Sequence, residues 1–451
     1  MQDLWSLVSE NKILNHISDR LRPNTYLVGG CIRDMLLGRQ PDDFDIVTFR
    51  DVWTLAQEIA AGFGTRPFWM DRSREIVRIS LKKHHATIDI SSPKGQDIEM
   101  DLAKRDITIN AMGYDVAGRK LIDPVQGIDD LEHSTIRMIS EDNLKDDPLR
   151  SLRSLRFSVV LGFDIDEHTL TMIRCNADLL YSVSPERIRQ ELMKALCFSG
   201  GAAMFALMNR CSVTDIIFPE YKGLGRGTHE DMSLLQACVQ AAVKAERLIN
   251  NADAILEGIG DELDSAVEEY VTRAGIIKLA AFLYNMDIAN LSRRTDVDRH
   301  VHKASEKVRD ICAGLRFSNR AAGIITGLIE NHRMTRDCIC SARVTNRDMH
   351  GLCKVCMDYM PETLLLALAA TPGGDGSGTD IRKTVSGIWT YYHDTFIHHK
   401  NNPLIRGGDV VHALGIRPGP MVGMLLERVE DARAEGIVQT KEQALEYIRS
   451  G

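Results

Sequence analysis

The chain has 451 residues, of which 44% are hydrophobic and 26% charged, and a formal net charge of −8. This length is too great for one ordinary core and predicts about three or four domains, while the composition excludes a disordered chain. No apolar run is long enough to span a bilayer and no basic-then-apolar leader pattern opens the sequence, so we expect a cytoplasmic protein with no membrane segment.

The first informative stretch joins an apolar run to two glycines. Residues 26–28 predict a strand that ends at Gly29 and Gly30, where backbone N–H groups can approach phosphate oxygens closely. The cation Arg33 follows within a helix-like segment. A Gly-Gly pair alone is usually a turn, so the stretch becomes informative only with what comes after it.

Two aspartates lie on the next predicted strand. Asp43 and Asp45 flank Phe44, and alternate residues of a strand share one face, so both carboxylates project together while Phe44 turns into the core. Paired carboxylates suit Mg²⁺, which takes oxygen ligands and shares them with substrate phosphates. The sequence therefore predicts a metal site at Asp43 and Asp45.

Further segments extend this predicted sheet. Helical spacing and strand alternation follow one another along the chain, with helices over 1–23 and 50–65 and strands over 76–81 and 86–91. Asp89, on the last of these strands, is a candidate third catalytic carboxylate, and its alternative is a solvated strand-end aspartate. The polar and aromatic stretch 67–75 predicts a mobile loop.

Two basic stretches follow. Residues 101–112 contain Lys104 and Arg105 before Asp106, and the short polar side chains of Asp106 and Asn110 could instead cap a following helix. Further on, Asp147 and Pro148 precede a predicted helix whose arginines recur every three residues and form one basic stripe, namely Arg150, Arg153 and Arg156.

These stretches together resemble the tRNA nucleotidyltransferase and poly(A) polymerase family of polymerase β-like enzymes, and the bacterial class II CCA-adding or A-adding enzymes in particular. Residues 26–47 are similar to motif A of the family. Residues 104–111 resemble its Arg-Arg-Asp-Phe-Thr-Ile-Asn-Ala motif, with Lys104 and Ile107 as departures. Asp146 replaces the glutamate of the Glu-Asp-x-x-Arg motif.

The resemblance implies a role for each site residue. Asp43 and Asp45 hold metal, with Asp89 assisting, and Asp147 and Arg150 read the edge of the incoming base by an acceptor and a donor. The other implied ligands bind the triphosphate and ribose or support the site, namely Gly29, Gly30, Arg33, Arg105, Arg153 and Arg156. Residues 184–192 resemble the Glu-Arg-x-x-x-Glu motif, for which an ion-paired network is favoured.

Beyond residue 200 the pattern is almost wholly helical. Residues 228–231 and 279–287 weakly resemble an HD phosphohydrolase domain, but Tyr284 and Asn285 stand where metal ligands are needed, so we expect no hydrolase activity.

The spacing of Cys338, Cys340, Cys353 and Cys356 raises the question of zinc, yet 349–370 reads as one continuous helix with buried thiols, which we favour. Residues 371–379 predict a linker. Residues 403–436 predict a turn followed by an amphipathic helix, which resembles an RNA-contacting tail.

The predicted fold class is α+β, with a polymerase β-like sheet domain followed by an all-α neck, body and tail. The domains are a catalytic head at 1–140, a neck at 141–200, a body at 201–372 and a tail at 380–451. The implied activity adds C and/or A from CTP and ATP to the 3′ end of tRNA with Mg²⁺. Poly(A) polymerase and a catalytically silent RNA-binding protein are the alternatives; CC-only or A-only addition and a homodimer stay open.

Overall fold

The computed structural model describes residues 4–222, 234–284, 297–371 and 379–450. Its contacts divide the chain into two compact units, one of residues 1–187 with 207–216 and one of residues 188–206 with 217–451. Among the helices in these described ranges, none has both the length and the apolar character needed to cross a membrane.

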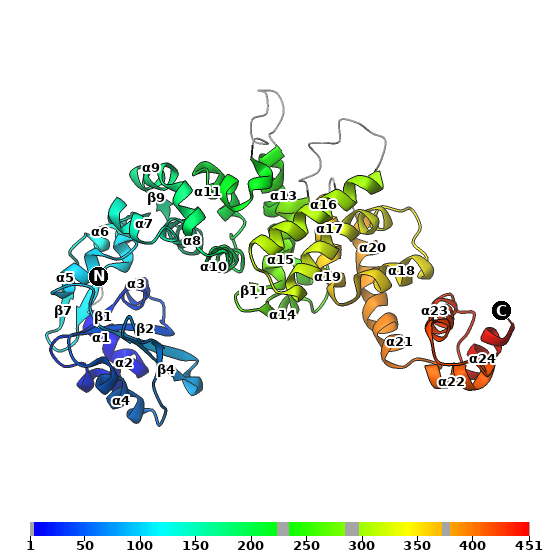
Figure 1. The fold of residues 1–451 in the computed structure, drawn as a ribbon, viewed down its shortest axis with the longest axis horizontal. Helices are drawn as coiled ribbons and strands as arrows, with labels where there is room; N and C mark the ends of the chain where they lie inside the picture. The colour runs from blue at the N-terminus through cyan, green and yellow to red at the C-terminus, as the bar shows by residue number, and fades with distance from the viewer. Residues whose placement is uncertain (1–3, 223–233, 285–296, 372–378, 451) are drawn as a thin grey trace. The chain divides into compact units, whose positions relative to one another are not determined.

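The first unit is built on a mixed sheet, drawn in blue and cyan in Figure 1. Within the described residues the sheet has seven strands in the order β3-β4-β5-β2-β1-β6-β7. β2 and β5 are parallel, and the other neighbours are antiparallel. The strands predicted over 26–28, 43–47, 76–81 and 86–91 are confirmed. The seven strands are β1 (Thr25–Val28), β2 (Asp43–Thr48), β3 (Phe68–Asp71), β4 (Ile76–Leu81), β5 (Ala86–Ser91), β6 (Gly113–Asp115) and β7 (Lys120–Ile122). β3 is not among the predicted strands, because it lies within the stretch 67–75 for which the sequence predicts a loop.

Strand alternation gives this sheet two different faces. Phe44 and Ile46 of β2 and Ile88 of β5 are buried on one face, against which α4 (Val52–Gly62) packs. The predicted helix over 50–65 is thereby confirmed. Asp43 and Asp45 occupy the alternate positions of β2, so they project from the opposite face. Burial of one face therefore fixes where the carboxylates point.

Short helices precede and follow the sheet. The helix predicted over 1–23 is divided into α1 (Leu4–Glu10), α2 (Lys12–Ile17) and a 3-10 turn, because Asn11 accepts hydrogen bonds from the N–H groups of Ile13 and Leu14 and starts a new helix. The remaining elements of the unit are α3 (Gly30–Leu36), α5 (Ile98–Ala103), η3 (Thr108–Asn110), α6 (Gly127–Glu132), β8 (Thr135–Ile136), α7 (Glu141–Asp146), α8 (Arg150–Leu161), β9 (Asp164–Ile165) and α9 (Glu167–Cys175).

The second unit is mostly helical. Its main helices are α10 (Pro185–Leu196), which starts in the first unit, and α13 (Leu234–Ile249), α15 (Arg273–Leu283), α16 (Val297–Gly314), α17 (Asn319–Ile339), α18 (Asn346–Cys356), α19 (Met360–Ala370), α20 (Thr379–Thr390) and α21 (His398–Asn401). Residues 228–231 and Asn285 of the HD resemblance lie outside the described residues, as does most of the predicted linker. α14 (Gly260–Leu263) and the pair β10 (Ala266–Glu268) and β11 (Val271–Thr272) complete this unit, while α11 (Ala203–Arg210) and α12 (Thr214–Ile217) each have residues in both units.

The continuous helix predicted over 349–370 is wrong. α18 ends at Cys356, and Met357 has a φ of +46°, a left-handed value that no helix interior adopts. Pro361 then lies in the first turn of α19, where N–H groups have no acceptor within the helix, so its lack of an N–H costs no hydrogen bond. Cys353 and Cys356 are nevertheless buried, as predicted.

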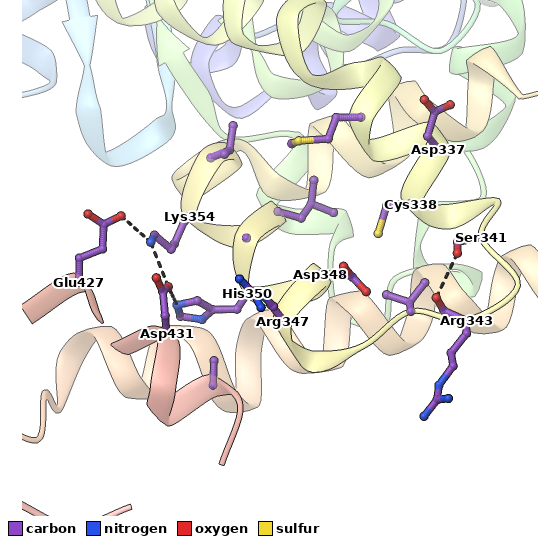
Figure 2. A pocket seen from close by; sticks show the side chains of 16 residues that line it. Asp337, Cys338, Ser341, Arg343, Arg347, Asp348, His350, Lys354, Glu427 and Asp431 are labelled. Carbon is purple, nitrogen blue, oxygen red and sulfur yellow. Dashed lines mark hydrogen bonds and ion pairs between the residues drawn. The ribbon is translucent and has the colours of Figure 1, made fainter. Parts of the chain in front are cut away.

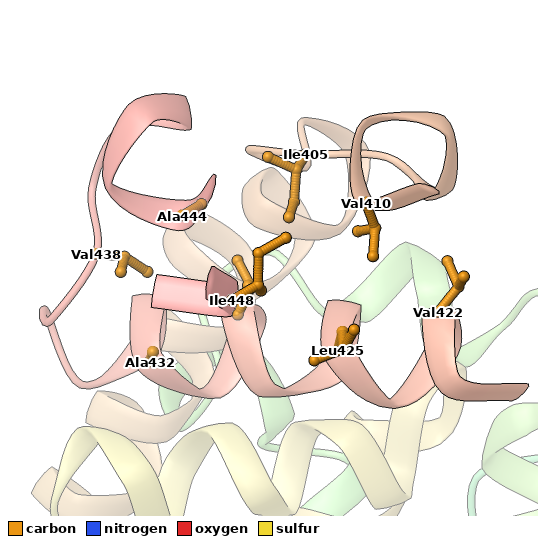
Figure 3. Packing of buried hydrophobic residues seen from close by; sticks show 9 residues of the cluster. Ile405, Val410, Val422, Leu425, Ala432, Val438, Ala444 and Ile448 are labelled. Carbon is orange, nitrogen blue, oxygen red and sulfur yellow. The ribbon is translucent and has the colours of Figure 1, made fainter. Parts of the chain in front are cut away.

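The C-terminal helices form a cluster of their own. α22 (Gly407–Leu414), α23 (Pro420–Ala434) and α24 (Lys441–Ser450) enclose a small core to which Val410, Leu425 and Ile448 contribute (Figure 3). The helix predicted to end near residue 435 is thus confirmed. This apolar seam explains the amphipathic pattern of the tail sequence.

Candidate active site

The three aspartates of the candidate site lie on adjacent strands. Asp45 of β2 is directly opposite Asp89 of β5 in the parallel pair, and Asp43 is opposite Thr87. Side chains at matched positions of neighbouring strands share a face, so Asp43, Asp45 and Asp89 project together. The structure therefore brings together the three carboxylates that the sequence singled out.

Each aspartate has a different environment. Asp43 accepts a hydrogen bond from the Thr87 hydroxyl. Asp89 accepts two hydrogen bonds from Arg78 of β4, from Nε and Nη2, each at 2.7 Å. Asp45 has no hydrogen-bonding side-chain partner among the residues that the structure describes. Of the three carboxylates, that of Asp45 is therefore the one whose oxygens are available to an external ligand.

The electrostatics of Asp45 fit a cation. Its pKa is raised because the surrounding protein displaces water, and because the charges of Asp89 and Asp43 oppose its ionisation, although Arg105 partly offsets them. Clustered carboxylates with incomplete neutralisation have the donor chemistry of a Mg²⁺ site. Within the described ranges no group of three or more His, Cys, Asp or Glu side chains forms a metal site by itself.

Gly29 brings the chain close to these groups. Its φ of +81° lies in the region that favours glycine, and a Cβ built there would be 2.7 Å from Nη1 of Arg105 and 3.4 Å from Oδ2 of Asp45. Arg105 also lies 3.5 Å from the buried Asp101. The glycine therefore gives the cation and the carboxylate room to lie beside the start of α3, where phosphate is expected.

Arg33 is held in a buried network. Its Nη1 donates to Oδ1 of Asn110 at 2.6 Å, and its other donors contact Asp34 at 2.8 to 2.9 Å. Only 8% of Arg33 is exposed. Asn110 therefore orients Arg33, and neither Asn110 nor Asp106 caps a following α-helix, which corrects that alternative.

The three arginines of α8 make different contacts. Arg153 contacts the buried Asp106 at 2.7 and 2.8 Å, Arg150 donates to the carbonyl of Arg105 at 3.1 Å, and Arg156 lies over the ring of Phe157. Burial works to raise the pKa of Asp106, but the charge and hydrogen bond of Arg153 outweigh it and hold this pKa below its usual value. Arg153 thus balances the charge of the buried Asp106.

The base-reading candidate Asp147 is paired as well. Arg187, in the first turn of α10, contacts it at 3.0 Å. The ion-paired network favoured for residues 184–192 therefore includes Arg187, though its partner is Asp147. Glu191 is 3.6 Å from Lys194.

Two residues near the site escaped sequence reasoning. Arg78 pairs with Asp89. The sequence contained a signal for this pair, because a cation on one predicted strand can face a carboxylate on the neighbouring strand. Lys94 has a lowered pKa, caused by loss of hydration and then by the charge of Arg150, with Arg105 contributing. No spacing rule connects Lys94 with these arginines.

A separate pocket lies wholly in the second unit. It has a volume of about 740 Å³ and is lined by parts of α17, α18 and α23 (Figure 2). Lys354 contacts Glu427 and Asp431 there, and Asp431 also lies 3.5 Å from the buried His350. Cys338 lines the pocket too, whereas burial raises the pKa of Cys353 to about 12 and of Cys356 to about 11, which favours neutral thiols.

Models of known protein families match three parts of the chain. The family model described as "Poly A polymerase head domain" matches residues 25–137, and the "Probable RNA and SrmB- binding site of polymerase A" matches 162–224. A tRNA nucleotidyltransferase domain 2 model matches 299–448. The chain belongs to the tRNA nucleotidyltransferase and poly(A) polymerase family.

Relatives of this tRNA nucleotidyltransferase family align along nearly all of the chain. The CC-adding tRNA nucleotidyltransferase of Geobacter sulfurreducens is 29% identical and that of Synechocystis sp. 27%, and the alignments cover 94% and 95% of this chain and 91% and 94% of theirs. The A-adding tRNA nucleotidyltransferase of Deinococcus radiodurans is 27% identical, with 95% of both chains covered.

Solved structures share the fold. A CCA-adding enzyme in apo form I matches with a TM-score of 0.70 at 21% identity, covering 100% of this chain and 97% of its own. The Thermotoga maritima CCA-adding enzyme in complex with tRNA matches with a TM-score of 0.66 at 22% identity, covering 100% and 98%. The predicted α+β class, a polymerase-like head followed by helices, is confirmed.

Proposed function

We propose that the protein is a template-independent nucleotidyltransferase that adds C and/or A from CTP and ATP to the 3′ end of tRNA and releases pyrophosphate. The observation that carries this function is the placement of Asp43 and Asp45 on one sheet face, with Asp45 next to Gly29 and Arg105. Relatives named CC-adding and A-adding tRNA nucleotidyltransferases support it. A cytoplasmic location follows from the substrate.

In this proposal Asp43 and Asp45 would hold Mg²⁺. A bound Mg²⁺ would neutralise charge on the attacking and leaving oxygens of an in-line displacement. Gly29 and Gly30 offer the N-terminal end of α3 to the triphosphate, and Arg105 neutralises its charge. Arg33, held by Asn110, keeps that end of α3 in position.

The base is read from the next helices. Asp147 accepts a hydrogen bond from an exocyclic amino group, and Arg150 donates to a ring nitrogen or carbonyl. Cytosine and adenine both carry such an amino group beside an acceptor, whereas uracil does not. This donor and acceptor pair therefore favours CTP and ATP over UTP.

One experiment tests the function and its alternatives. tRNA transcripts ending at the discriminator base, at C or at CC are incubated with CTP or ATP separately, and the products are sequenced. We expect one to three nucleotides of C, A or CCA. Long A tails on these transcripts would instead support a poly(A) polymerase, which the head-domain match favours as the second candidate.

The loss-of-function control uses the carboxylates. Asp43→Asn and Asp45→Asn should lose incorporation by about 1,000-fold or more while tRNA affinity changes less than about twofold. Retained incorporation in both variants would overturn the assignment of the catalytic carboxylates.

A further inference from the structure

Arg78 and the aspartates form a row across three strands. Arg78 of β4 is directly opposite Asp89 of β5 in the antiparallel pair, and Asp89 is directly opposite Asp45 of β2. Val77 and Ile79, on either side of Arg78, have no exposed surface. The core thus fixes the backbone of β4, and sheet register brings the guanidinium to Asp89.

The contact between Arg78 and Asp89 is specific. Two parallel hydrogen bonds of 2.7 Å join the guanidinium to both carboxylate oxygens, which is the strong, planar form of this pair. Both side chains are about one-quarter to one-third exposed. Asp89 therefore has its charge balanced, and each of its oxygens already accepts one hydrogen bond, on the same face that carries Asp43 and Asp45.

We propose that Arg78 is a positioning residue that withholds Asp89 from the metal, so that Asp43 and Asp45 are the two protein carboxylates that bind the cation. This inference rests on the proposed function. Asp45 already faces the charges of Asp43 and Asp89, and pairing with Arg78 reduces the second of these. Asp89 is then an orienting and charge-balancing neighbour of the site.

The inference predicts opposite effects for the two members of the pair. Arg78→Gln releases Asp89 as an extra carboxylate and should tighten cation binding by about fivefold. Asp89→Asn leaves the positive charge of Arg78 beside the site and should weaken binding by about fivefold. The double variant removes both charges, so its affinity should return to within about twofold of the wild type.

The measurement is a titration of the substrate-free, full-length enzyme with Mn²⁺ alone, in which electron paramagnetic resonance reports the free ion. Arg50→Gln is the matched control, because Arg50 makes a similar double contact with Glu58, at 3.2 and 3.1 Å, on the part of the unit near α4. Arg50→Gln should leave Mn²⁺ affinity unchanged, and Asp45→Asn should weaken it strongly.

Several results would overturn the inference. If Asp89 were itself a ligand, the double variant would bind Mn²⁺ as weakly as Asp89→Asn. Unchanged or weaker binding by Arg78→Gln, or a gain that persists in the double variant, also counts against it, as does undiminished binding by Asp45→Asn. A wild-type enzyme that binds Mn²⁺ but extends no tRNA would instead reject the proposed function.

Discussion

Arg187 donates from Nη2 to both carboxylate oxygens of Asp147, at 3.2 and 3.0 Å. Asp147 follows α7 directly and has extended backbone angles. Because it is outside the helix, neighbouring helical residues do not restrict its side-chain rotamer. The first turn of α10 therefore orients the residue that we assign to base reading. The pair is partly exposed, which limits its value for stability.

The first prediction concerns nucleotide choice. Arg187→Ala should lower the preference for CTP and ATP over UTP by about tenfold, because Asp147 loses the contact that sets its rotamer, while the melting temperature changes little. kcat/KM for each nucleotide on matched tRNA measures this. Lys145→Ala, which removes the exposed partner of Glu141, is the control and should keep full selectivity. Equal losses for every nucleotide would indicate a general rather than a base-reading role.

The second prediction separates backbone strain from site geometry at two glycines. Gly29 and Gly38 both have positive φ, of +81° and +72°, so alanine should cost each about 1 to 2 kcal/mol of folding free energy. Only at Gly29 does the new Cβ meet Arg105, because nothing lies within 4 Å at Gly38. Gly29→Ala should therefore also lower kcat/KM for the nucleotide by more than about tenfold, whereas Gly38→Ala should not. Denaturant unfolding and steady-state kinetics on both variants provide the comparison.

The third prediction uses the raised pKa of Asp45. A carboxyl group whose pKa is higher in the folded than in the unfolded chain binds more protons when folded, so its ionisation lowers stability as pH rises through this interval. Without a divalent cation, Asp45→Asn should therefore be more stable than wild type by a small amount at neutral pH and equal to it at acid pH. Thermal melts in chelator across the pH range measure this, and the gain should shrink when Mg²⁺ is added. A gain that is independent of pH would contradict the charge explanation.

The fourth prediction concerns Arg153. Arg153→Ala leaves the buried Asp106 without its ion-pair partner and should cost about 2 kcal/mol at neutral pH, with Arg153→Lys intermediate. The pKa of Asp106 is depressed in the folded state, so the contribution of the pair is present above the unfolded pKa and is lost as pH falls through the folded one. The deficit should accordingly narrow in acid. Urea unfolding at several pH values tests this, and a constant deficit would point to lost packing against Phe157 instead.

Local sequence patterns determined much of the fold. The alternation of Asp43, Phe44 and Asp45 set both the strand and the face of its carboxylates, because strand geometry leaves alternate side chains no other arrangement. The same reasoning failed over 349–370, where helical spacing continues through Met357 although its left-handed backbone ends the helix. The periodicity of apolar residues predicts which face of a helix is buried, but it does not predict a single residue with positive φ.

The sequence by itself therefore determined the sheet face of Asp43 and Asp45, the glycine turn at Gly29 and each motif of the family resemblance, since each depends on residues close together in the chain. Only the tertiary structure decided which charges are paired. Arg153 with Asp106, Arg187 with Asp147 and Arg78 with Asp89 are joined by the packing of separate elements. The sequence shows that an arginine carries a charge but not which carboxylate it contacts, and the packing of the elements determines that contact.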